Sequence, residues 1–307
     1  MSQRRAPDEV LRRLELTINR KLDGLLQGDY RGLVPGHGSE LGETRLYQPG
    51  DDTRRIDWNV TARMQVPHVR ETIADRELET WLLIDQSASL DFGTAECEKR
   101  DLVLNAAAAV GFLTSRNGNR LGAMLLQPNA EPVIVPARTG RTHLQSVLHR
   151  VVTAPRLEGA GPTDLARGID HLGAAMRRRG LAVVISDWLD PTAWQMPLRR
   201  LGVRHDVLAV EAVDPRELAL ADVGMLELVD PETGRVYEVQ TSDVGLRERY
   251  AAAAAAQRAA IAADLRASGA DHLVLHTDTD WLLDLVRFVT SRRRNRQSVA
   301  PTIVVNH

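Results

Sequence analysis

Apolar residues recur at helical spacing at the start of the chain. Leu11, Leu14, Ile18 and Leu22 mark one face of a helix. This spacing predicts an amphipathic helix over residues 8–27 that packs on a core through that face.

The helical pattern is lost over residues 28–78, which are rich in glycine, proline and paired charges. Short strands and turns are predicted here, with one short helix around residues 54–63. The segment Tyr47–Arg63 is open to two interpretations: a structural motif with a Pro-Gly turn and Asp–Arg pairs, or a partner-binding surface. Trp58 is expected to be buried and to anchor it.

From residue 79 onward, predicted strands alternate with predicted helices. Trp81–Ile84 is an apolar run that ends at Asp85, which is typical of a buried parallel strand. The further strands are predicted at 121–126, 132–135, 181–185, 206–213 and 273–275, and the helices at 96–115, 142–152, 163–179, 192–201, 244–268 and 280–290. The turn signal between 126 and 132 pairs those two strands as a hairpin. This order predicts a doubly wound α/β domain with a mostly parallel sheet between two helical layers.

The pattern divides the chain into four parts: an N-terminal helix (1–27), a β-rich region (28–78), the α/β domain (79–290) and a basic C-terminal tail (291–307). A β-hairpin insertion is expected at about 214–242, with strands Met225–Val229 and Val236–Gln240 flanking Pro231–Gly234. The basic cluster of the tail consists of Arg292, Arg293, Arg294 and Arg296.

Composition narrows the class of protein. The chain has 307 residues, 41 acidic and 39 basic, with a formal net charge of −2. This balance and an aromatic content of 4% argue against a nucleic-acid-binding protein. No apolar run is long enough to cross a bilayer, and the first residues lack an export signal. With a single cysteine, Cys97, nothing requires an oxidising compartment, and a cytoplasmic protein is expected.

The candidate chemistry consists of oxygen-bearing side chains at strand ends. Asp85, Ser87 and Ser89 directly follow one apolar strand, and Asp187 follows another. Ligands of a doubly wound sheet bind beyond the carboxyl ends of the strands, where the strand order reverses, so the two carboxylates are expected to converge there. Thr163 opens the helix that leads into the second strand, and its hydroxyl can reach the same edge. Such donors suit Mg²⁺, Mn²⁺ or Ca²⁺ and leave a position open for an external ligand.

The pattern Asp85-x-Ser87-x-Ser89, followed by Thr163 and Asp187, resembles the metal-ion-dependent adhesion site of von Willebrand factor A-like domains. The segment Tyr47–Arg63 and the run Asp230-Pro-Glu-Thr-Gly234 are similar to the bacterial family known as domain of unknown function 58. Many members of that family carry membrane segments before this signature, and none is expected here.

The resemblance implies binding rather than catalysis. It implies that the five residues hold the metal directly or through water, and that a partner's Asp or Glu fills the remaining position. Because members are commonly associated with MoxR-type AAA+ ATPases, the partners implied are such an ATPase and a client protein with an acidic ligand residue, the chain acting as an adaptor or co-chaperone.

Two alternatives remain. The hydroxyl residues could only cap helices, in a scaffold whose metal site is vestigial. The chain could also be a Mg²⁺-dependent phosphatase-like hydrolase. Against this, Ser87 stands where that chemistry needs a second aspartate, and neither lysine of the chain, Lys21 or Lys99, lies in the stretch that would supply a phosphate-binding lysine.

Overall fold

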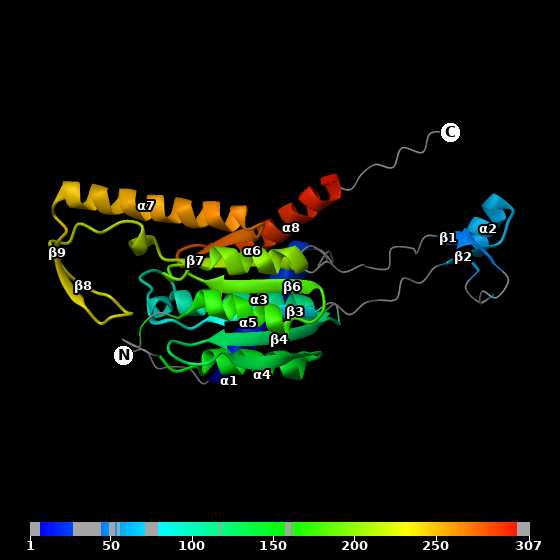
Figure 1. Cartoon of the computed structure of the whole chain (residues 1–307), viewed down its shortest axis with the longest axis horizontal. Coiled ribbons are helices and arrows are strands. Elements are labelled where there is room, and N and C mark those ends of the chain that lie inside the picture. The colour runs from blue at the N-terminus through cyan, green and yellow to red at the C-terminus, as the bar shows by residue number, and fades with distance from the viewer. Residues whose placement is uncertain are drawn as a thin grey trace. The chain divides into compact units, whose positions relative to one another are not determined.

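The computed structural model describes residues 7–26, 44–48, 53, 56–70, 79–116, 118–156, 161 and 163–299. The chain forms two compact units: Met1–Val34 together with Leu78–His307, and Pro35–Glu77. Figure 1 shows the elements of both units.

A six-stranded sheet forms the centre of the larger unit, in the order β10-β7-β6-β3-β4-β5. All neighbouring strands are parallel except β4 and β5, which form the expected antiparallel pair. The strands are β3 (Glu79–Asp85), β4 (Arg120–Leu126), β5 (Val133–Arg138), β6 (Gly180–Ser186), β7 (Asp206–Val213) and β10 (Asp271–His276). The strand order reverses between β3 and β6, where the sequence placed it.

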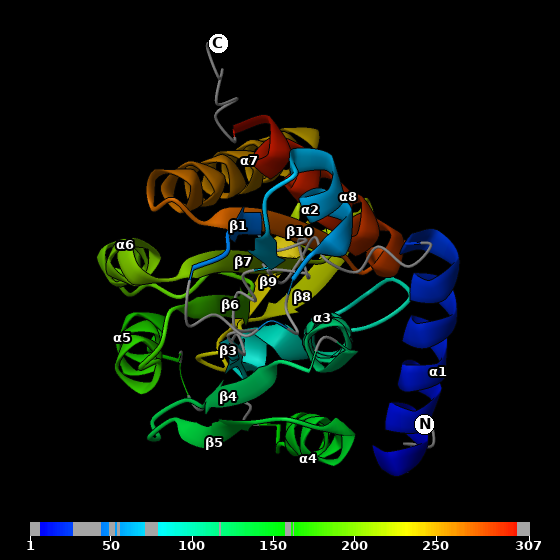
Figure 2. The ribbon, with the colours of Figure 1, turned by 90° about the vertical axis from the view of Figure 1, so that its right-hand side faces the viewer.

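Helices cover both faces of this sheet (Figure 2). The helices are α3 (Lys99–Arg116), α4 (Arg141–Val152), α5 (Leu165–Ala175), α6 (Gln195–Arg204), α7 (Val244–Ala267) and α8 (Trp281–Val299). One core lies between the sheet and α3, α4 and α8, and a second lies between the sheet and α5, α6 and α7. The doubly wound, three-layer α/β architecture predicted from the sequence is therefore confirmed.

The N-terminal helix α1 (Pro7–Leu26) packs outside the first helical layer, against α3, α4 and α8. Leu14 and Ile18 belong to the first core, as the periodicity predicts. None of the helices in the described part of the chain is apolar enough over a sufficient length to cross a bilayer.

Several element boundaries differ from the predictions by a few residues; α3, for example, begins at Lys99 instead of 96, and α6 covers Gln195–Arg204 instead of 192–201. The helix expected from 163 begins at Leu165, because Asp164 accepts a hydrogen bond from the backbone N–H of Arg167 and so caps it. The second hairpin strand is longer and ends at Arg138. The last helix continues past 290 through the expected basic tail to Val299, and Arg292 is buried with its Nε 2.5 Å from an oxygen of Asp271 on β10.

The smaller unit contains an antiparallel pair, β1 (Thr44–Leu46) and β2 (His68–Arg70), and the short helix α2 (Trp58–Met64). Asp57 caps α2 by accepting bonds from the backbone N–H groups of Asn59 and Val60. The prediction that Trp58 is buried is wrong: its exposed fraction is 70%. The side chain lies on the first turn of α2 and is left in solvent, while Asp57 and Val69 are buried.

The backbone of Gly180 lies so close to the neighbouring strand that it leaves no room for a side chain. A Cβ atom there would lie 2.1 Å from the carbonyl oxygen of Glu79 on the neighbouring strand. Gly180→Ala is therefore expected to lower the free energy of unfolding by about 1–3 kcal/mol in urea denaturation. Gly173→Ala in α5 is the control, because its Cβ would meet only Leu201, at 3.6 Å, and alanine favours the helix. Equal stability of the two variants would contradict the steric argument.

Candidate metal centre

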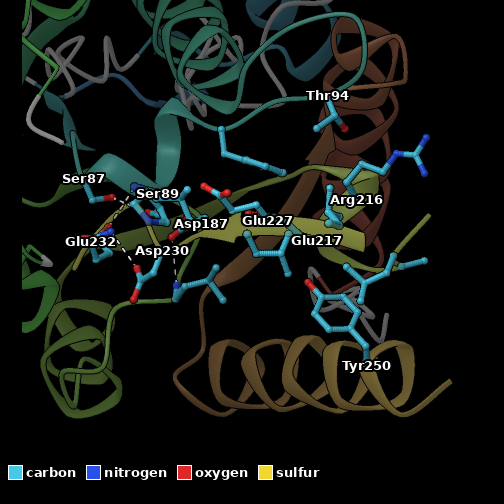
Figure 3. A pocket seen from close by; sticks show the side chains of 18 of the residues that line it. Ser87, Ser89, Thr94, Asp187, Arg216, Glu217, Glu227, Asp230, Glu232 and Tyr250 are labelled. Carbon is cyan, nitrogen blue, oxygen red and sulfur yellow. Dashed lines mark hydrogen bonds between the residues drawn. The ribbon is translucent and has the colours of Figure 1, made fainter. Parts of the chain in front are cut away.

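Three loops at the carboxyl edge of the sheet carry the five residues predicted as the site. Asp85 ends β3, and Ser87 and Ser89 lie in the turn that follows, at the start of the short helix η3 (Ala88–Asp91). Asp187 directly follows β6, and Thr163 precedes α5. The structure brings all five together, because they line one cavity of 810 Å³. Figure 3 shows three of them, Ser87, Ser89 and Asp187.

Asp85 is the buried centre of a hydrogen-bond network. Its Oδ1 accepts bonds from the backbone N–H of Ser87 at 2.9 Å and from the hydroxyl of Thr163 at 3.1 Å. Its Oδ2 accepts a bond from the hydroxyl of Ser186 at 2.7 Å. One carboxylate therefore links all three loops, and Ser186 joins the site although the sequence analysis did not select it.

The two serines of the first loop face one another. The hydroxyl oxygens of Ser87 and Ser89 are 2.9 Å apart, and the Ser89 hydroxyl also contacts Asp187. Figure 3 shows both serines at the same end of the cavity as Asp187, Asp230 and Glu232. The five predicted residues thus form one continuous set of oxygen donors.

Lys99 was not predicted as part of this site. Its ammonium, from the first turn of α3, is fully buried and lies 2.8 Å from Oδ2 of Asp187. It also bonds Glu217, which follows β7 in the short helix η4 (Pro215–Glu217). Burial opposes the charge on Lys99, but the two carboxylates outweigh it and raise its pKa, so the ammonium stays charged.

The two central carboxyl groups have opposite pKa shifts. Burial, together with the charge of Asp187, raises the pKa of Asp85 from 3.8 to about 7. Burial acts in the same direction on Asp187, but the adjacent Lys99 outweighs it and lowers the pKa of Asp187. Without a metal, the site therefore holds one carboxylate paired with a lysine and one carboxyl group that binds a proton below about pH 7.

Two further residues hold these loops in place. Asp190 accepts bonds from the backbone N–H groups of Leu165 at 2.9 Å and Thr192 at 2.6 Å, which fixes the start of α5 beside Thr163. Arg258 of α7 donates to the backbone oxygen of Asp187 at 2.9 Å. Neither residue was selected from the sequence: Arg258 comes from a segment remote from the motif along the chain, and Asp190, three residues after Asp187, is not part of the motif.

The donor set fits a hard divalent cation. Within the described ranges, no three His, Cys, Asp or Glu side chains are grouped closely enough to hold a metal by themselves, so the hydroxyls of Ser87, Ser89 and Thr163 would have to take part beside the carboxylates. Oxygen donors of this kind suit Mg²⁺, Mn²⁺ or Ca²⁺ better than Zn²⁺. The ammonium of Lys99 already pairs with Asp187, so a cation bound at this edge would share that carboxylate with it.

The location of Lys99 corrects one argument made from the sequence. The order of the chain gave no reason to place either lysine near a phosphate-binding position, yet Lys99 reaches the carboxyl edge of the sheet. Ser87, however, occupies the position where a phosphatase-like site would need a second aspartate.

The segment similar to the family signature lies in the smaller unit. Asp57 caps α2, which favours a structural role for that residue, whereas Trp58 is exposed. Pro49, Gly50 and the pairs 51–52 and 54–55 lie outside the described residues. The choice between a structural motif and a partner surface stays open for the segment as a whole.

Comparison with known proteins identifies the family. A model described as "Protein of unknown function DUF58" matches residues 43–260. The uncharacterized protein Rv1480 of Mycobacterium tuberculosis is 57% identical over 285 residues, covering 93% of this chain and 89% of the relative.

Solved structures with similarity include the conserved hypothetical protein BatB of Bacteroides thetaiotaomicron, with a TM-score of 0.47 and 11% identity over 71% of this chain and 99% of that one. Another is the SpRpn10 VWA domain, with a TM-score of 0.39 and 14% identity over 69% of this chain and 94% of that domain. On the strength of the family match and the mycobacterial relative, the chain belongs to the DUF58 family of proteins of unknown function.

Proposed function

We propose that this chain is a metal-dependent protein-binding module rather than an enzyme. Asp85, Ser87, Ser89, Thr163 and Asp187 would hold Mg²⁺, or Mn²⁺ or Ca²⁺, at the carboxyl edge of the sheet. The observation that carries this proposal is the convergence of these five oxygen-bearing side chains, from three loops, on one cavity at the point where the strand order reverses.

The charges of the site explain why it would select an acidic partner. A bound divalent cation supplies an electrophile that accepts a carboxylate oxygen as ligand. Of the five residues only Asp85 and Asp187 carry charge, and Asp187 is already paired with Lys99. The protein therefore neutralises the cation only in part, which favours an Asp or Glu side chain from a partner over a neutral one.

The partners belong to this proposal as well. In the bacterial cytoplasm the chain would act as an adaptor or co-chaperone that couples a MoxR-type AAA+ ATPase to a client protein, as the family resemblance suggests. Co-purification of the ATPase with the wild-type protein, lost on chelation and in Ser87→Ala, is the expected result. An ATPase that stays bound in both cases would show that the metal is not the point of contact.

Metal binding itself is tested by calorimetric titration with Mg²⁺ and Mn²⁺. The wild-type protein is expected to bind at one site, and Asp85→Ala is expected to bind at none, because the variant lacks the carboxylate that links the three loops. Glu227→Ala is the control, since Glu227 lines the same cavity but belongs to the hairpin strand. No binding by the wild-type protein would favour a scaffold with a vestigial site.

The buried Lys99 beside Asp187 gives one specific reason to test a phosphatase-like hydrolase as the second candidate. A screen of phosphate esters with Mg²⁺ or Mn²⁺ is expected to show no turnover, because Ser87 cannot serve as the second carboxylate. Turnover that disappears in Asp85→Ala would replace the binding module with this enzyme class.

A further inference from the structure

The tip of the β-hairpin formed by β8 (Met225–Val229) and β9 (Val236–Gln240) is a rigid turn. Asp230 accepts a bond on its side chain from the backbone N–H of Glu232 at 2.9 Å, and its backbone oxygen accepts one from Gly234 at 2.8 Å. Gly234 has a φ of +69°, which a residue with a side chain rarely adopts. These bonds fix the direction in which Glu232 points.

This tip contacts two of the three loops of the candidate metal centre. The Oε1 of Glu232 accepts a hydrogen bond from the backbone N–H of Ser89 at 3.1 Å. The backbone oxygen of Glu232 accepts a bond from the N–H of Gly161, two residues before Thr163, at 3.1 Å. Figure 3 shows the Glu232 side chain beside Ser87 and Ser89.

The second carboxylate oxygen of Glu232 lacks a bond. Within the described part of the chain, Oε2 is buried and meets no hydrogen-bond partner at bonding geometry, although the Ser89 hydroxyl contacts the same carboxylate group. A buried carboxylate oxygen without a partner is costly unless a donor or a cation meets it. Its location beside the two serines of the candidate centre therefore points to a cation as the missing partner.

Hydrogen bonds hold the hairpin at its base and at its tip, and the residues between these two points line the cavity. At the base, the hydroxyl of Thr241 donates to the backbone oxygen of Gly224 at 2.7 Å. Between base and tip, Leu226 and Leu228 line the cavity whose floor includes Asp85 and Asp187. The hairpin thus forms one wall of the cavity and places Glu232 beside Ser89.

We propose that Glu232 is an internal carboxylate ligand of the metal and occupies the position that a partner's acidic side chain would take. This inference rests on the proposed metal site. A tethered carboxylate has an effective concentration in the millimolar range or above. A partner would therefore bind the metal only by displacing Glu232, which requires the hairpin tip to withdraw from Ser89 and Gly161.

The test uses Mn²⁺ as the probe with the full chain, and measures both affinity and water proton relaxation. Glu232→Gln keeps an oxygen that can accept the Ser89 N–H but removes the charged ligand. We expect its Mn²⁺ affinity to fall at least about tenfold. Mutation of a residue that only supports a metal ligand already weakens metal binding by about that factor, and loss of a direct ligand should weaken it at least as much. We expect relaxation per bound Mn²⁺ to rise as one water enters the shell. Glu227→Gln, which removes an acid from the same cavity, is expected to match the wild-type protein in both measurements.

Acetate distinguishes an open ligand position from a damaged one. In Glu232→Gln, acetate is expected to displace the extra water and lower the relaxation, while in the wild-type protein it is expected to have little effect. Unchanged affinity and relaxation in Glu232→Gln would contradict the proposal that Glu232 is a ligand, but not the proposal that the five residues bind a metal. Lower affinity without an extra water would also overturn the ligand role of Glu232, because Glu232 would then act only by positioning Ser89. Absence of Mn²⁺ binding by the wild-type protein would overturn both proposals.

Discussion

Asp85→Asn is expected to stabilise the metal-free protein at pH 8 while abolishing metal binding. The folded state raises the pKa of Asp85 from 3.8 to about 7, so between these values the folded protein holds a proton that the unfolded chain has released. The free energy of unfolding of the wild-type protein therefore falls as the pH rises through this window and levels off above it. Asparagine has the same shape and no charge, so the variant lacks this loss.

The expected magnitude follows from the shift. Between pH 5 and pH 8, the wild-type protein is expected to lose about 3 kcal/mol of stability relative to Asp85→Asn. Urea denaturation of both proteins in the presence of a chelator measures this difference. At pH 8, Mg²⁺ at a hundred times its Kd is expected to stabilise the wild-type protein by about 2.7 kcal/mol and the variant by nothing. A stability difference that stays constant with pH would contradict the raised pKa.

Ionisation of the buried Asp85 lowers the stability of the metal-free protein, whereas it would favour metal binding. Metal binding would therefore account for a carboxyl group at a position where its charge is costly. Ionised Asp85 lies in a dry environment beside the ionised Asp187, and the hydrogen bonds from Ser186, Ser87 and Thr163 only partly compensate. A divalent cation would remove that cost. A group kept only for structure would have no reason to retain the charge, so Asp85 carries the mark of a functional residue.

The edge of the sheet was predictable because its signals are local. Each central strand is a continuous apolar run that stops at an acidic residue, Asp85 in one case and Asp187 just beyond the other, and strands buried on both faces require such runs. The rule that ligands bind where the strand order reverses then places the two residues side by side. The hairpin strands β8 and β9 begin and end at the predicted residues for the same reason, since they alternate around a strong turn.

What could not be predicted is the contact between elements that are distant along the chain. The position of Glu232 at Ser89 depends on how the whole hairpin lies over the sheet edge, which no local pattern encodes. Trp58 was wrongly expected to be buried, because the smaller unit leaves the first turn of α2 in solvent.

Lys99 is a different case, because a signal was present. Leu102 and Val103 lie three and four residues after Lys99 and therefore on the same helical face, and all three residues are buried. Lys99 is also one of only two lysines in a chain whose other positive side chains are arginine. A lysine on an apolar face requires acidic partners, and Asp187 and Glu217 supply them.

Removal of the Lys99 charge is expected to have the largest effect on stability. In Lys99→Met the apolar stem is replaced by one of similar length, and the buried carboxylate of Asp187 loses its partner. Breaking a buried pair in this way costs about 3–5 kcal/mol. Urea denaturation in the presence of a chelator is expected to show a loss of that size. Lys21→Met is the matched control, because its pair with Asp280 is half exposed and should contribute less than about 1 kcal/mol.

Mg²⁺ then separates a structural ion pair from a charge that belongs to the metal site. Because the cation would bring positive charge to the same carboxylate, Mg²⁺ is expected to raise the Tm of Lys99→Met by more than that of the wild-type protein. Equal shifts in the two proteins would mean that the lysine and the metal act independently on Asp187. A larger shift in the variant would mean that Lys99 balances the charge of Asp187 when no metal is bound. Metal binding would then replace the interaction of Asp187 with the ammonium by an interaction with the metal ion.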